Sequence, residues 1–77
     1  MNKARRKMLQ GIIDNLDAQR EQIEAVQEEE QEAFDNLPES MQYSERGETM
    51  NENASDLEQA ASDLEDIIST LQEIMER

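Results

Sequence analysis

Cysteine, histidine and tryptophan are absent from this chain of 77 residues, which has one proline, one tyrosine and one phenylalanine. The lack of cysteine rules out disulfides, and the lack of both cysteine and histidine rules out a structural zinc site. No run of about 18 apolar residues occurs, so we expect no membrane-spanning segment and no membrane partner. A chain this short predicts a single small domain (1–77), stabilised by regular helix packing or by oligomerisation.

The lack of a secretory signal and of cysteine predicts where in the cell the chain resides. Its basic start, Met1–Lys7, is followed by the apolar pair Ile12-Ile13, but Asp14 interrupts this segment too early for a secretory signal. Together with the lack of cysteine, this predicts a cytoplasmic protein.

Positive charge is also scarce: the chain has 7 basic and 20 acidic residues, and its formal net charge is −13. This balance argues against direct binding of nucleic acid, which depends on clustered lysine and arginine. High charge and few aromatic residues are typical of disordered chains as well. We nevertheless expect a folded chain, because the apolar residues are periodic.

Three consecutive heptads in the second half nearly repeat: residues 54–60, 61–67 and 68–74. Their first, fourth and seventh positions are apolar, which predicts a coiled-coil-like helix over about 48–76. Its start lies between Ser44 and Thr49, since either residue can cap it. Two apolar columns form an unbroken series of three- and four-residue steps: Met50, Ala54, Leu57, Ala61, Leu64, Ile68, Leu71 and Met75. A third column consists of Ala60, Ile67 and Ile74.

The first half predicts another helix, over about 2–35. Its apolar stripe is regular if Gln19 and Glu30 occupy two polar steps within it. We expect Glu30 at the edge of the stripe and leave Gln19 open between edge and core. The stripe itself is Leu9, Ile12, Leu16, Ile23, Val26 and Ala33, widened by Met8, Ile13 and Phe34.

Residues 36–47 form the joint between the two helices. Pro38 disfavours helical geometry at Leu37 and suits the first position of a new helix. We therefore expect a short helical turn at about residues 38–42.

Charge predicts that the helices fold back on each other. The first ten residues carry four cations, an unfavourable sign at a helix start. In an antiparallel hairpin these cations lie beside Asp66, Glu73 and Glu76. The predicted fold class is therefore all-α, an antiparallel helical hairpin with a short helical turn at its joint.

Three apolar columns on the second helix are more than one neighbouring helix covers. We therefore expect a homodimer in which two hairpins form a four-helix bundle. The largest apolar side chains collect at the open end of the hairpin, and they are the predicted self-association residues: Met8, Leu9, Ile12, Ile13, Leu16, Ile67, Ile68, Leu71, Ile74 and Met75.

No residue pattern points to catalysis, a cofactor or a metal. The serines have no base in a recognisable pattern, and Ser55, Ser62 and Ser69 share one heptad position, as on a solvated face. The acidic clusters lack the glycine and spacing of a calcium loop, and the histidine of helical-bundle metal sites is missing. We expect a non-enzymatic protein.

The acidic surface has two interpretations. One is a helical protein whose copies are kept apart by repulsion. The other is imitation of the phosphates of nucleic acid, which would occupy a basic site on another protein. Residues 14–35 carry nine acids and one arginine along about 33 Å of helix. The candidate mimic surface is Asp14, Asp17, Glu21, Glu24, Glu28, Glu29, Glu32 and Asp35.

The joint from Asp35 to Glu48, followed by heptads of Leu-Glu type, resembles small hypothetical proteins encoded by bacteriophages and mobile elements of bacteria. The resemblance implies a helical hairpin made in the cytoplasm of a bacterial host cell, and it carries no activity. By analogy with small acidic phage proteins, it favours binding to a host protein, including an immunity protein.

The first hypothesis is therefore an interaction module that binds and modulates or inhibits an unidentified protein partner. The joint supplies the candidate partner-binding residues, because a turn does not require apolar or directional side chains: Leu37, Met41, Tyr43 and Arg46. The alternative role for these residues is to cap the end of the bundle. The other hypotheses are the acidic mimic and a purely structural helical oligomer.

Overall fold

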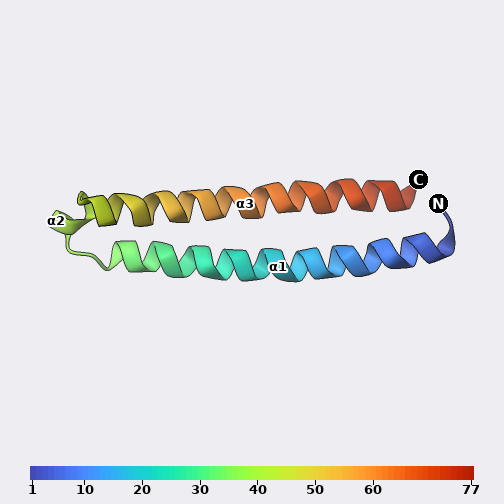
Figure 1. Ribbon diagram of the computed structural model, residues 1–77, viewed down its shortest axis with the longest axis horizontal. Helices are drawn as coiled ribbons and strands as arrows, with labels where there is room; N and C mark the ends of the chain where they lie inside the picture. The colour runs from blue at the N-terminus through green and yellow to red at the C-terminus, as the bar shows by residue number, and fades with distance from the viewer.

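Two long antiparallel helices make up most of the chain, and the computed structural model describes all residues, Met1–Arg77. Helix α1 (Lys3–Asp35) and helix α3 (Glu45–Glu76) are joined through the short helix α2 (Glu39–Gln42). The long helices lie side by side along their length, and both termini lie at the same end (Figure 1). The predicted all-α antiparallel hairpin with a helical turn at its joint is confirmed. Neither long helix has an apolar stretch of the length that crossing a bilayer requires.

The helix ends follow from local hydrogen bonds. At the start of α1, the Arg5 backbone N–H donates to Asn2 Oδ1 at 2.8 Å. At its end, the Asn36 N–H donates to the Glu32 carbonyl at 3.0 Å, just before the segment that Pro38 restricts. Both ends of α1 thus satisfy some of the backbone groups that a helix end leaves unpaired.

Helix α3 starts three residues before the predicted boundary at 48. Ser44 is the cap, because its Oγ accepts the Gly47 backbone N–H at 3.2 Å. Thr49, the alternative cap, lies inside the helix. The earlier start satisfies an N–H with the Ser44 side chain and places two acids, Glu45 and Glu48, in the first turn, where the helix dipole favours them.

The face of α3 toward α1 is the predicted one. Ala54, Ala61 and Ile68 are buried, and the other members of the predicted series are half-buried. This regular alternation of three- and four-residue steps is the seam of a coiled coil. Buried alanines at two positions let the helix backbones approach each other closely.

The face of α1 toward α3 differs from the prediction by one column. Ile12, Val26 and Ala33 were predicted to face the partner helix, but all three are exposed. Burying Ile13 and Phe34 in their place removes more apolar area from water, while the polar residues in this column can extend their ends to solvent. The buried or half-buried residues of the observed series are Leu9, Ile13, Leu16, Arg20, Ile23, Gln27, Glu30 and Phe34.

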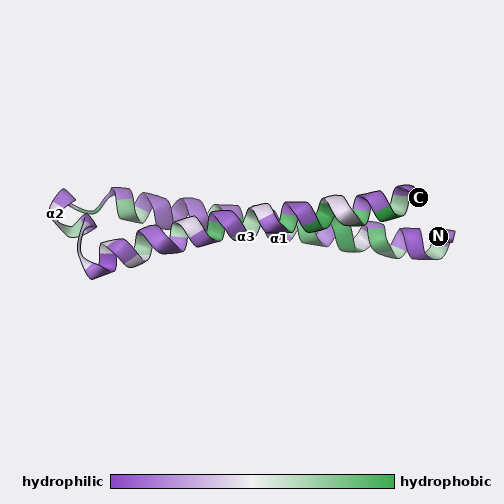
Figure 2. Ribbon diagram, turned by 90° about the horizontal axis from the view of Figure 1, so that it is seen from above, coloured by the Kyte–Doolittle hydropathy of each residue, from purple (hydrophilic) through white to green (hydrophobic).

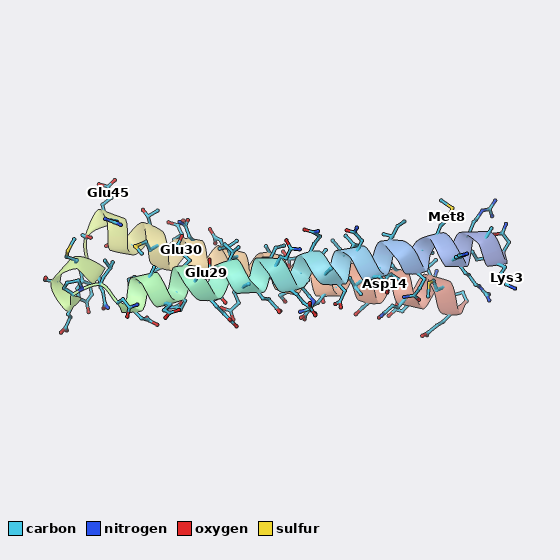
Figure 3. All side chains as sticks on the ribbon, turned by 90° about the horizontal axis from the view of Figure 1, so that it is seen from below. Lys3, Met8, Asp14, Glu29, Glu30 and Glu45 are labelled. Atoms are coloured by element: carbon cyan, nitrogen blue, oxygen red, sulfur yellow. The ribbon has the colours of Figure 1, made fainter.

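Polar contacts between the helices agree with this register. Asn53 Nδ2 donates to Glu30 Oε2 at 3.2 Å, and Arg20 lies 3.6 Å from Glu65 Oε1. Glu30 is half-buried between the helices, which fits the predicted edge position (Figure 3). Gln19 is exposed, so it is not a core residue.

Candidate functional site

The joint displays its side chains at the closed end of the rod. Tyr43 is 79% exposed, Met41 is 43% exposed, and Arg46 is also exposed at the start of α3. Leu37 is half-buried, which suits the alternative role of capping the end of the hairpin. Three of the four candidate partner-binding residues are therefore accessible.

Hydrogen bonds fix the backbone that carries these side chains. The Met41 and Gln42 backbone N–H groups both donate to the Pro38 carbonyl, at 2.8 and 3.1 Å. The Gln42 side-chain amide donates to the carbonyls of Phe34 and Leu37, at 3.4 and 3.2 Å. The single turn of α2 is thereby tied to the end of α1.

Gly47 fixes the other side of the joint. This residue is buried, and a Cβ atom there would collide with the backbone carbonyls of Met41 and Gln42. Ser44 connects the two segments, because its hydroxyl donates to the Met41 carbonyl and also caps α3. Tyr43 therefore projects from a short segment that is anchored on both sides.

Midway along the rod, the two long helices flank an acidic groove. Arg20 lies at its edge, with its side chain 17% exposed and paired to Asp17 and Glu24 at 2.9 Å each. The hydrogen bonds that the Arg20 guanidinium donates to Asp17 and then to Glu24 raise its pKa above the ordinary value. The groove is lined by Glu24, Gln27, Glu28, Glu58, Ala61, Ser62 and Glu65.

Arg20 was not singled out by the sequence reasoning. It sits four residues after Leu16 and three before Ile23, which is the spacing of the observed contact series. Its long side chain can bury the aliphatic stem against α3 while the guanidinium reaches the acidic groove.

The candidate mimic residues surround α1 and do not form a single face. Asp17 and Glu24 are half-buried and paired with Arg20. The other six are exposed, and four of them recur every seven residues along one line of the helix: Asp14, Glu21, Glu28 and Asp35. Glu28 belongs both to this line and to the lining of the acidic groove, whereas Glu29 and Glu32 belong to neither.

Most of the predicted self-association residues are occupied within the hairpin. Ile13 and Ile68 are buried, so they are unavailable to a second copy. Five more are half-buried within the hairpin, so less of their apolar area is available to a second copy: Leu9, Leu16, Leu71, Ile74 and Met75. Only Met8, Ile12 and Ile67 are exposed, at 69%, 47% and 51%.

The basic start of α1 lies beside the end of α3, as the charge pattern predicts (Figure 1). The expected pairing with Asp66, Glu73 and Glu76 does not form, since every ion pair in the structure involves Arg20. The four cations in question are exposed and point into solvent: Lys3, Arg5, Arg6 and Lys7.

No group of three or more acidic side chains has the arrangement of a metal site. Comparison of the chain with protein families, with curated proteins and with solved structures finds no match in any of the three.

Proposed function

We propose that this chain is a non-enzymatic interaction module that binds a host protein through the tip formed by Met41, Tyr43 and Arg46. The observation that supports this function is the 79% exposure of Tyr43, the only tyrosine of the chain. Tyrosine, methionine and arginine are enriched in protein interfaces, and tyrosine and arginine dominate binding hot spots. The anchored backbone supports this proposal further, because a preorganised loop loses little conformational entropy on binding.

The test compares proteins captured from a lysate of the native host by the wild type and by Tyr43→Ala. We expect Tyr43→Ala to lose a captured protein while its helicity and its melting midpoint stay unchanged, because the side chain is exposed. Glu39→Ala, an exposed change on the same short turn, is the matched control and should retain the protein. If Tyr43→Ala and Glu39→Ala capture the same proteins equally well, the tip is not the binding site.

Fluorescence gives a direct second measurement. The chain has no tryptophan, so its emission comes from Tyr43 alone. Acrylamide, an uncharged quencher, should quench Tyr43 readily in the free protein, and addition of the captured partner should protect it once the partner's own emission is subtracted. Unchanged quenching in the complex would count against contact at the tip.

The second candidate function is the acidic mimic of nucleic acid. The observation in its favour is that residues 21–63 carry fourteen acidic side chains and a single arginine, Arg46. Such a mimic competes with DNA or RNA for a basic protein, and salt weakens its binding strongly.

A charge-matched pair of variants tests the mimic. Replacing Glu21, Glu28 and Asp35 by their amides should weaken competition by at least tenfold. Replacing Asp66, Glu73 and Glu76 by their amides removes the same charge at the other end and should leave competition nearly unchanged. Equal effects of both triple variants would indicate a general charge effect and contradict a mimic surface.

A further inference from the structure

The two halves of the rod differ sharply in charge. The open half, residues 1–20 and 64–77, carries six basic and six acidic side chains, whereas the closed half, residues 21–63, carries fourteen acidic side chains and one arginine. The formal charge of −13 therefore belongs entirely to the closed half. Hydrophobic residues have the opposite distribution and gather toward the termini (Figure 2).

One side of the open half has no acidic residue on α1. We call the uncharged face the surface formed by Met8, Ile12, Asn15, Gln19 and Ile67. Met8 and Ile12 line an open groove together with Ile74, and the cation Arg5 lies at its border, so α1 and α3 both contribute to this side of the rod. Ile67 lies one heptad before Ile74, on the same line of α3 and next to Asp66. Met8 projects from the opposite edge of α1 to Asp14, which belongs to the acidic line (Figure 3).

We infer that the uncharged face binds a second copy of this chain, with the two rods antiparallel and only their open halves overlapping. This arrangement covers Met8, Ile12 and Ile67 of each copy with the same surface of the other. It also leaves the two closed halves pointing in opposite directions.

Charge decides between this arrangement and a parallel one. Parallel rods would place two closed halves side by side, each with a charge of −13, at a separation of about one Debye length in ordinary buffer. In the antiparallel overlap with its axis near Ile12, the basic residues 3–7 of one copy lie level with residues 17–21 of the other, where the acidic closed half begins. Like charges are separated and unlike charges approach, so the antiparallel overlap has the lower electrostatic energy.

The overlap has the size of a modest interface. Residues 3–19 of α1 extend over about 25 Å. A strip of this length and two helices wide buries roughly 1,000 Å² in total, which is where specific interfaces begin. The dimer is therefore reversible and concentration-dependent, and four helices lie together only within the overlap.

A matched pair of charge substitutions tests the surface. Ile67 and Val26 are each 51% exposed, but Val26 lies in the closed half, outside the proposed overlap, whereas Ile67 lies within it. In sedimentation from micromolar to millimolar concentration, the wild type and Val26→Glu should become dimers, and Ile67→Glu should stay a monomer with unchanged helicity. A wild type that remains monomeric throughout, or equal behaviour of the two variants, overturns the proposal.

Cysteine substitutions test the direction of the rods, because the native chain has no cysteine. With the two-fold axis near Ile12, two copies of Ile12→Cys should oxidise to a covalent dimer. Val26 lies 14 residues further along α1, so its two copies are about 42 Å apart and Val26→Cys should not cross-link. If Val26→Cys cross-links as readily as Ile12→Cys, the rods are parallel and the inference is overturned. If Ile12→Cys does not cross-link, the inference is also overturned.

The dimer is independent of the proposed binding tip, which lies at the other end of the rod. Ile67→Glu should retain the captured host protein, and Tyr43→Ala should retain the dimer. A result that contradicts one of the two proposals therefore leaves the other unaffected.

Discussion

At the residue scale, the two glycines of this chain have opposite surroundings. A Cβ on Gly47 would collide with the Met41 and Gln42 carbonyls, which form part of the joint. A Cβ on Gly11 would have no neighbour within 4 Å, and Gly11 lies in the interior of α1. Gly47 is needed for close approach of backbone segments, whereas Gly11 only lowers helix propensity.

Alanine substitution should therefore change stability in opposite directions at the two sites. Gly47→Ala should lower the free energy of unfolding by about 1–3 kcal/mol, because the carbonyls or the helix start have to shift. Gly11→Ala should raise it by up to about 1 kcal/mol through helix propensity. Urea unfolding followed by circular dichroism measures both, and destabilisation of equal size would contradict the assigned roles.

At the element scale, the contact between α1 and α3 depends on which column of α1 joins Leu9, Leu16 and Ile23. The structure uses the column that contains Ile13 and leaves the one containing Ile12 outside. These two isoleucines are adjacent in sequence and identical in chemistry, but Ile13 is 3% exposed and Ile12 is 47% exposed. Their difference is therefore a direct measure of the helix orientation.

We expect Ile13→Ala to cost about 2–4 kcal/mol of stability, because it leaves a cavity in the contact between the helices. Ile12→Ala should cost less than about 1 kcal/mol in dilute solution, since much of its surface is already in water. Chemical denaturation of both variants measures the difference. A larger cost for Ile12→Ala would mean that α1 is rotated toward the column predicted from the sequence.

At the scale of the whole molecule, the rod has little interior. It extends over 58 × 15 × 13 Å and exposes 5801 Å², compared with roughly 4,800 Å² for a compact monomer of its mass. Only four apolar residues are fully buried: Ile13, Ala54, Ala61 and Ile68. Stability therefore depends on a thin seam that has to withstand the repulsion of a net charge of −13.

Added sodium chloride should consequently raise the melting midpoint. Salt shortens the Debye length from about 30 Å at 0.01 M to about 3 Å at 1 M, which screens repulsion over the closed half. The triple amide variant at Glu21, Glu28 and Asp35 should melt higher at low salt and respond less to salt. A midpoint that falls with salt would show that the Arg20 ion pairs outweigh the repulsion.

The sequence by itself determined the two long helices, their antiparallel direction and the entire face of α3 toward α1. The helices and the α3 face follow from heptad periodicity and from the turn at Pro38, which act over a few residues. The basic start of α1 indicated the antiparallel direction, although its cations form no ion pair. It did not distinguish the Ile12 column from the Ile13 column, because both satisfy three- and four-residue steps beside Leu9 and Leu16. Only packing against α3 decided that choice, since the buried area of Phe34 and the reach of Arg20 depend on a helix distant in sequence. The exposure of Tyr43 was likewise decided by the tertiary structure, through the close approach at Gly47 that anchors the joint.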